Sequence, residues 1–330
     1  MAKSVITRFI FAAIIYSGLA LYLYSSRLDS LSSVQYLLLI NSVIASVGAF
    51  VLSRRWLYSF AASVLTGALF GFGPFALSFG CYHPAASFPF AMLPWLFCPA
   101  AFLPKSRLLG PKLTVLASAA LSLLPILITI LFFEIARDYS LVPIPIKTSL
   151  NWASLCSAIT PLTQPPQNFL LSFYHIPAPA LLMGLVMFFK VRRFGITTIF
   201  IATVFLICYK PIFNVPPVFW TSIVILYCAI IIGAGLEGLT LAGTADSKWV
   251  LTAAVFSAIL ALVAISFGLG FDKTYLIAAK MHSLGTLAVF IIFFITRASA
   301  SLHWLRLLIF ISAIIVDVLI TSAIIINRIL

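Results

Sequence analysis

The chain has very little charge. Only 8% of its 330 residues are Asp, Glu, Lys or Arg, and only seven are acidic. A soluble domain carries about 25% charged residues, so the composition argues against a water-soluble globular protein. In place of charge, 63% of the residues are hydrophobic, which is more apolar surface than a protein core absorbs but suits a bilayer. The composition therefore indicates an integral membrane protein.

The sequence also lacks the motifs of common soluble enzymes. It contains no C-x-x-C pair, zinc-type spacing, P-loop, H-E-x-x-H or G-x-S-x-G pattern. Gly233, Gly235 and Gly238 match the dinucleotide-binding pattern G-x-G-x-x-G, but they end an apolar run, whereas that fold needs a strand before them. We interpret these glycines as a place of close helix packing. We therefore expect no cofactor and no metal.

Apolar runs of about 20 residues, the length that crosses a bilayer, repeat along the whole chain. They predict an all-α, polytopic transmembrane bundle of about 11 spans that forms one integral membrane domain over residues 1–330, with no soluble domain. The first run follows Lys3 and Arg8 without a clear cleavage site, so we expect a retained span. The predicted spans cover residues 5–24, 34–52, 57–79, 84–104, 113–133, 168–189, 195–209, 218–236, 249–269, 275–296 and 303–326.

The net charge of +13 comes from basic residues in short runs between the apolar segments. This placement is typical of topology signals and gives no support to a nucleic-acid partner. With a cytoplasmic N-terminus and a crossing at 84–104, thirteen Lys and Arg residues lie inside and seven outside; a re-entrant 84–104 gives ten on each side. The positive-inside rule thus favours the crossing. We expect a plasma (inner) membrane protein with its N-terminus in the cytoplasm.

One predicted span, residues 84–104, is interrupted by prolines at every fifth position. They are Pro84, Pro89, Pro94, Pro99 and Pro104. A proline inside a helix cannot donate to the carbonyl four residues earlier. The affected carbonyls are those of Ala85, Phe90, Trp95 and Ala100. Such carbonyls must be buried in protein or line a wet cavity at membrane depth, so we expect a kinked helix that requires neighbouring helices.

Other segments are also irregular. Residues 134–167 form the longest predicted loop, which is rich in proline and lies on the outer side in this topology. Pro177 and Pro179 interrupt the span at 168–189, and the span at 195–209 would reach only about 22 Å. Short or broken spans in both halves of a chain are a feature of transporters.

Asp317 lies inside the last predicted span, where a carboxylate is costly and is by default a hypothesis of function. Its candidate partners are Lys280 and His282 on the preceding span. These two residues are two positions apart and face different sides of a helix, so we expect only one to meet Asp317. The alternatives are a structural ion pair, or a Lys280 that extends to the outer interface.

Three histidines are further polar residues that the predicted topology places on the outer side or in the outer half of the bilayer. His83, His175 and His282 all fall on the outer side or in the outer half of the predicted topology. The candidate substrate- or ion-binding residues are therefore Asp317, Lys280, His282, His175 and His83. Cys81 and Cys156 also fall outside, where the compartment permits a disulfide between them.

Three functions remain open on the sequence. The favoured one is a transport-type protein that binds or moves a small or lipidic molecule at a polar site in the outer half. The second is an integral membrane transferase or hydrolase for a lipid-linked substrate, with His83, His175 or Asp29 as acid or base. The third is a non-catalytic subunit of a membrane complex. The expected partners are the lipid bilayer, such a substrate, and other membrane subunits.

Overall fold

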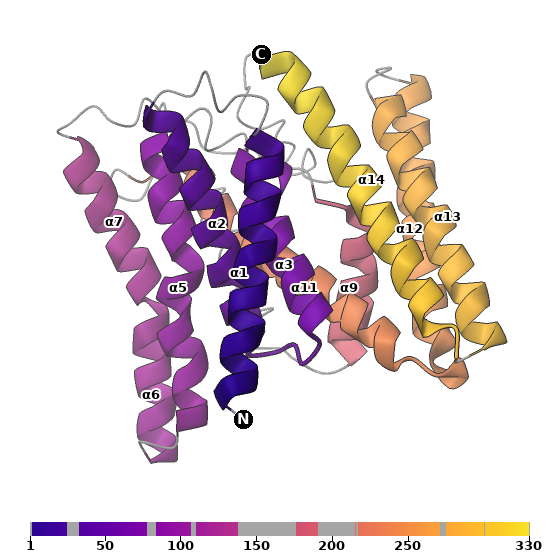
Figure 1. Cartoon of the computed structure of the whole chain (residues 1–330). Helices are drawn as coiled ribbons and strands as arrows, with labels where there is room; N and C mark the ends of the chain where they lie inside the picture. Colours follow the sequence, from indigo (N-terminus) through magenta and orange to yellow (C-terminus); the bar gives the residue numbers. More distant parts are fainter. Residues whose placement is uncertain are drawn as a thin grey trace. The chain divides into compact units, whose positions relative to one another are not determined.

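The computed structural model describes residues 2–24, 33–77, 84–106, 110–137, 176–190, 215, 217–270, 275–299 and 301–329. These residues are almost entirely helical, and no strand occurs among the elements they form (Figure 1). The predicted all-α class is confirmed for this part of the chain. The predicted span at 195–209 lies outside the described residues.

Seven helical stretches in the described ranges are long and apolar enough to cross a membrane. They are Ile6–Leu23, Phe60–Leu77, Pro111–Ile135, Phe219–Leu241, Thr244–Gly270, Leu276–Ala298 and His303–Ile320. Shorter apolar helices cover Leu38–Ser53, Ser87–Leu103 and Ala178–Met187. These helices are compatible with an integral membrane protein. The total of about eleven spans and the lack of a soluble domain stay predictions.

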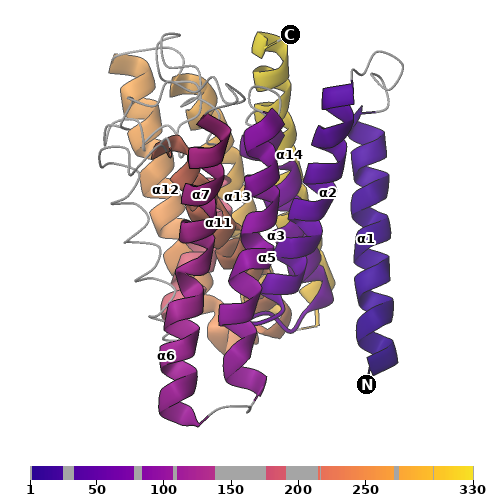
Figure 2. The same ribbon diagram turned by 90° about the vertical axis from the view of Figure 1, so that its left-hand side faces the viewer.

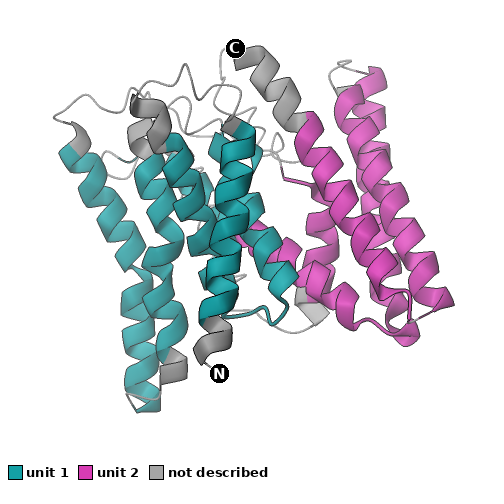
Figure 3. Ribbon diagram, in the orientation of Figure 1, with its two compact units in different colours: residues 1–150, 200–226 teal, residues 151–199, 227–330 magenta. Residues whose placement is uncertain are grey.

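The chain divides into two compact units (Figure 3). Unit 1 contains Met1–Leu150 and Phe200–Leu226, and unit 2 contains Asn151–Ile199 and Tyr227–Leu330. Helix α11 (Pro217–Leu241) begins in unit 1 and continues in unit 2. The single membrane domain over residues 1–330 stays a prediction.

Unit 1 is built around helix α2. Its helices are α1 (Ala2–Tyr24), α2 (Ser33–Ser53), α3 (Phe60–Phe72), α5 (Pro84–Ser106), α6 (Pro111–Ser122) and α7 (Leu124–Arg137), together with the start of α11. Helix α2 packs against α1, α3 and α5, and α1 lies along α2 in both views (Figures 1 and 2). Helix α5 in turn packs against α6 and α7.

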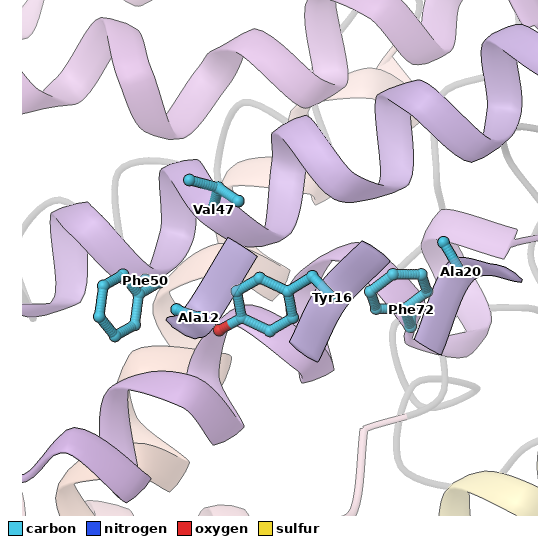
Figure 4. Close-up of a cluster of buried hydrophobic side chains, with 6 residues drawn as sticks. All are labelled: Ala12, Tyr16, Ala20, Val47, Phe50 and Phe72. Atoms are coloured by element: carbon cyan, nitrogen blue, oxygen red, sulfur yellow. The ribbon is translucent and has the colours of Figure 1, made fainter. Parts of the chain in front are cut away.

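A cluster of buried side chains joins the first three helices of unit 1 (Figure 4). Its centre is Tyr16 on α1, whose ring packs near Phe72 on α3 at a centroid distance of 6.4 Å. The Tyr16 hydroxyl donates to the Val64 carbonyl at 3.0 Å. A Cβ at Gly67 would overlap this hydroxyl, so the glycine lets α3 approach α1 closely. The cluster thus holds α1 against α3 by packing and by one interhelical hydrogen bond.

Helix α5 stays helical from Pro84 to Ser106 in spite of its prolines. The Ala100 carbonyl, which Pro104 cannot reach, instead accepts a bond from the Ser118 hydroxyl of α6 at 2.8 Å. The next carbonyl, Ala101, accepts from Arg55 Nε at 2.7 Å. The expectation that this helix depends on its neighbours is therefore confirmed at Ala100.

The predicted span at 113–133 lies within the membrane-length stretch Pro111–Ile135, which contains one turn. Helix α6 ends at Ser122 and α7 begins at Leu124, with a turn at Leu123. The cause is Pro125, which has no N–H to donate to the carbonyl four residues earlier. Helix α7 then extends to Arg137, so residues 134–137 are helical, and residues 138–167 of the predicted outer loop lie outside the described residues.

The described residues of unit 2 form four α-helices besides the second part of α11. They are α9 (Ala178–Lys190), α12 (Ser247–Gly270), α13 (Tyr275–Ala298) and α14 (His303–Ile329), with the short 3-10 helix η4 (Thr244–Asp246) before α12. Helix α13 packs against α9, α12 and α14. An interruption of the span at 168–189 was expected at Pro177 and Pro179; residues 176–177 are indeed not helical, and α9 begins at Ala178. Residues 168–175 lie outside the described residues.

The glycines of the G-x-G-x-x-G pattern are a place of close helix packing, as interpreted from the sequence. A Cβ at Gly235 would lie 3.0 Å from the Gly184 backbone of α9. A Cβ at Gly238 would lie 2.9 Å from the Met187 side chain. Gly235 and Gly238 therefore allow α11 and α9 to approach closely, and they lie within a helix rather than after a strand.

Candidate functional site

Asp317 lies on the buried stripe of α14. This stripe contains Arg306, Phe310, Ile314 and Asp317, at helical spacing, and all four side chains are buried. Asp317 itself is 7% exposed. The opposite face of α14 is apolar and exposed, for example at Leu308. Because this stripe faces the other helices of unit 2, the Asp317 side chain points into the unit from the middle of α14.

The side chain of Asp317 lines a small cavity formed by α9, α13 and α14. The start of α9 contributes Pro177 and Pro179, and α13 contributes Gly285 and Ala288. The centre of a water-sized sphere can occupy about 20 Å³ of this cavity. A site needs at least about 10–15 Å³ by this measure to hold one water. The cavity thus has room for water or a small ion beside the carboxyl.

Close approach of two helices shapes one wall of this cavity. A Cβ at Gly285 on α13 would lie 2.6 Å from the ring of Pro179. Any larger residue at position 285 would push α13 away from the start of α9. Gly285 therefore sets the distance between these two walls.

The N-terminus of α9 and the carboxyl of Asp317 share this cavity. Residues 176–180 are buried, and the Pro177 carbonyl accepts the bond from Leu181 N at 2.9 Å that opens the helix. The N-terminal end of a helix carries about half a positive charge and favours a nearby anion. The start of α9, where Ala178 and Ala180 keep their N–H groups, and the carboxyl-bearing residue Asp317 thus lie around one small space.

The two candidate partners of Asp317 lie on different faces of α13. Lys280 is exposed, and His282 is fully buried. Neither Lys280 nor His282 is among the described residues that line the cavity. The first residue of α13 that lines it is Gly285, about one turn after His282. The other candidates, His83 and His175, lie outside the described residues, as do Asp29, Cys81 and Cys156.

Arg306 is a buried polar residue that the sequence analysis did not single out. It was counted as a topology charge on the inner side, yet its side chain is 0% exposed. One guanidinium nitrogen, Nη1, donates to the Ala242 carbonyl at 2.9 Å and lies 3.5 Å from Thr296 Oγ1. Ala242 follows the last residue of α11, where helix carbonyls have no intrahelical partner. Arg306 thus ties the end of α11 to α13 and α14.

A signal for Arg306 was present in the sequence. The residue lies four positions before Phe310 and eight before Ile314, so a helical projection places it on the same stripe as Asp317. Because Arg306 lies close to the start of the predicted span at 303–326, it was instead counted with the basic residues on the inner side. A helical projection could not identify the partner, because the Ala242 carbonyl is 64 residues away in the sequence.

In the described part of the chain, no group of three or more His, Cys, Asp or Glu residues could hold a metal ion. Comparison with protein-family models, curated proteins and solved structures gives no match.

Proposed function

We propose that the chain is a multi-pass membrane protein of transport type, which binds or moves a small molecule or ion at the Asp317 cavity. The observation that carries this proposal is a buried carboxyl group in a membrane-length apolar helix, beside the start of a broken helix and next to a small cavity. A charged residue at the centre of a span costs about 2.5–3.5 kcal/mol by insertion scales and marks ion or substrate pathways.

The expected depths of Asp317 and of the start of α9 in the bilayer support the same proposal. Asp317 is 14 residues from His303, the first residue of α14, or about 21 Å along the helix. Ala178 is 12 residues from Lys190, the last residue of α9, or about 18 Å. The predicted topology puts Lys190 and His303 on the same side, so both groups would lie in the outer half of about 30 Å of hydrocarbon.

The non-helical backbone at residues 176–177 must meet a physical requirement at that depth. Irregular backbone within the hydrocarbon is tolerated only where it is buried in protein or lines a cavity. The backbone at residues 176–177 meets both conditions, because these residues are buried and Pro177 lines the cavity. The arrangement resembles the half-helix ends that transporters use to hold charged groups near the midplane.

The size of the cavity favours a small substrate over a lipidic one. A space of about 20 Å³ accepts a water or an ion, whereas a lipid-linked molecule would require a wide opening. The surrounding partner in this proposal is the lipid bilayer of a plasma membrane, and association with other membrane subunits is compatible with it. This proposal keeps the N-terminus in the cytoplasm, because the predicted topology without buried Arg306 still counts twelve basic residues inside against seven outside.

The substitution Asp317→Asn tests whether the carboxyl is kept for function or for structure. Asparagine keeps the size of the side chain and can form hydrogen bonds, but it cannot carry the negative charge. If the carboxyl serves function, we expect purified Asp317→Asn to stay folded in detergent, with a single elution peak, and to lose binding or transport. A folded variant that keeps full activity would contradict a functional role.

Transport also requires that the cavity open to each side of the membrane. A cysteine placed in the cavity wall would then be labelled by a water-soluble reagent from either side, while an enzyme's cavity would be labelled from one side only. This separates the transport proposal from the transferase alternative, whose candidate residues Asp29, His83 and His175 lie outside the described residues.

A further inference from the structure

We propose that the end of unit 1 that carries Arg8, Arg54 and Arg55 binds the phosphate headgroup of an anionic phospholipid. Helices α1 and α3 begin, and α2 ends, at this end of the unit (Figures 1 and 2). The proposal does not depend on the Asp317 cavity, which lies in unit 2. It gives the lipid partner a specific chemistry, that of a negatively charged phosphate ester.

Three phenylalanine rings bring Arg8 and Arg54 to the start of α3. The centroid of the Phe60 ring of α3 lies 6.2 Å from that of Phe11 of α1 and 5.8 Å from that of Phe50 of α2. Arg8 precedes Phe11 by three residues, so it lies on the same face of α1 and about one turn closer to the end. Arg54 follows Phe50 by four residues and has the same relation to it. Both positive side chains therefore lie beside the start of α3.

Hydrogen bonds to backbone carbonyls restrict the orientation of the other two arginine groups. Arg55 Nε donates to the Ala101 carbonyl of α5 at 2.7 Å, and Arg54 Nη1 donates to the Tyr58 carbonyl. Each of these bonds uses one of the five N–H donors of a guanidinium group. A planar fork of such donors matches two oxygens of one phosphate. This end of unit 1 thus has guanidinium groups that are already oriented by the fold.

Acidic side chains are scarce near this end. Residues 1–133 of the sequence contain one, Asp29, which comes after the other end of α1. Among the described residues of unit 1, the one acid is Glu134, near the end of α7. Glu134 lies about 24 Å along the helices from Ser118, whose hydroxyl bonds α5 one residue from the carbonyl that Arg55 binds. This end of unit 1 is therefore electropositive and suits an anionic partner.

The position of this end favours a lipid over a soluble anion. Helices α1 and α3 belong to the membrane-length stretches Ile6–Leu23 and Phe60–Leu77, so their first turns lie at headgroup level in the predicted topology. Arg8 is exposed within the first stretch, and its long side chain can extend to that level. Tyr58 is exposed just before α3, as is typical of the membrane interface. The predicted topology places this end in the cytoplasmic leaflet, where anionic lipids attract basic residues.

Native mass spectrometry of the purified full-length protein measures the binding of individual lipids. The probes are phosphatidylglycerol, which is anionic, and phosphatidylcholine, which has no net charge. We expect tighter binding of phosphatidylglycerol. Arg8→Gln should weaken this binding about fivefold, because a basic residue near an anionic surface contributes about 1 kcal/mol. Arg8→Lys keeps the charge and should retain most of the affinity.

The matched control is Arg297→Gln. Arg297 is an exposed basic residue of unit 2 that the predicted topology also places on the cytoplasmic side, and its loss should leave lipid binding unchanged. Arg55→Gln should weaken phosphatidylglycerol binding as Arg8→Gln does, but it also removes the bond to Ala101. Arg8 is exposed, so its substitution keeps the test valid if Arg55→Gln does not fold. A single elution peak establishes that each variant is folded.

Three results would overturn the proposal. The first is equal affinity for the two lipids. The second is a loss in Arg8→Gln no greater than that in Arg297→Gln, which would indicate a diffuse attraction to the net positive charge. The third is displacement of phosphatidylglycerol by excess inorganic phosphate, which would indicate a site for a soluble anion. None of these results bears on transport, which is tested separately at the Asp317 cavity.

Discussion

Buried polar side chains in this protein bond to backbone carbonyls of neighbouring helices. Trp95 Nε1 of α5 donates to the Ile44 carbonyl of α2 at 3.0 Å, and Arg306 Nη1 donates to the Ala242 carbonyl at 2.9 Å. Asn41 and Ser87 also bond across α2 and α5 at 2.6 Å. In a bilayer such bonds supply attraction between helices that apolar contact alone does not provide. Asp317 differs from these residues because it lies beside a cavity.

Substitution of Arg306 by alanine should destabilise unit 2. The change removes a charge-assisted bond to the Ala242 carbonyl and the packing of a fully buried side chain. Hydrogen bonds to charged groups contribute about 1.5–3 kcal/mol. Unfolding of the purified protein by denaturant should therefore show a loss of at least about 1.5 kcal/mol.

The matched control for this experiment is Arg297→Ala. Arg297 is exposed near the end of α13, and such a surface change usually alters stability by no more than about 0.5 kcal/mol. Equal effects of the two substitutions would contradict the anchoring role of Arg306.

Helix ends and helix breaks differ in how far they could be predicted. The predicted spans 34–52 and 275–296 coincide closely with α2 (Ser33–Ser53) and α13 (Tyr275–Ala298), because a bilayer-length apolar run satisfies its backbone only as a helix. The interruption before Ala178 was expected from Pro177 and Pro179, whereas the turn at Leu123, two residues before Pro125, was not expected. Helix α5 carries five prolines and remains helical. At Pro104, a neighbouring helix supplies a donor to the carbonyl that the proline leaves free, that of Ala100.

The candidate site could also be predicted from the sequence only in part. Asp317 could be singled out because a carboxyl among apolar residues is visible in the sequence. Its cavity could not, because the start of α9 and Gly285 meet Asp317 only when three helices pack. Lys280 was a candidate partner by spacing, but its side chain is exposed.

The α5–α6 contact provides a test of how prolines are accommodated. Ser118→Ala removes the donor to the Ala100 carbonyl and should cost about 1–3 kcal/mol, the penalty for an unsatisfied buried group. In a Pro104→Ala background the backbone N–H of residue 104 can bond Ala100, so the same serine substitution should cost much less. Thermal unfolding of the four proteins in this double-mutant cycle measures the coupling.

Ser122→Ala provides the control on the same helix. The Ser122 hydroxyl donates to Ala119 of its own helix at 2.6 Å and is exposed. Its loss should have little effect in either background. Additive effects of Ser118→Ala and Pro104→Ala would show that the serine does not replace the bond that proline removes.

At the scale of the whole molecule, the predicted topology depends on α5 crossing the bilayer. Its 23 residues reach about 34 Å, which exceeds about 30 Å of hydrocarbon. Gly110, which precedes α6 and is exposed, would then lie in the cytoplasm. In a protein without its native cysteines, Gly110→Cys should resist a membrane-impermeant thiol reagent in intact cells and react after permeabilisation.

Labelling of Gly110→Cys in intact cells would reverse this assignment. Every later connection would change sides, and the ten-to-ten distribution of basic residues would apply. The Asp317 cavity would then lie in the cytoplasmic half of the bilayer. The packing of α9, α13 and α14 around the cavity would be unaffected.

The most direct measurement of the central claim is two-sided labelling of Ala313→Cys. Ala313 lines the Asp317 cavity on α14, and the native residues Cys81, Cys98, Cys156, Cys208 and Cys228 are replaced by serine. A water-soluble thiol reagent is applied to vesicles of each orientation. Leu308→Cys, on the exposed apolar face of the same helix, reports lipid contact and should stay unlabelled.

The account predicts labelling of Ala313→Cys from both sides of the membrane, because a transport cavity opens to each side in turn. Labelling from one side only would favour an enzyme or a receptor. Protection from both sides, with the protein folded and Gly110→Cys reactive, would contradict the account and leave Asp317 a structural residue of a closed bundle.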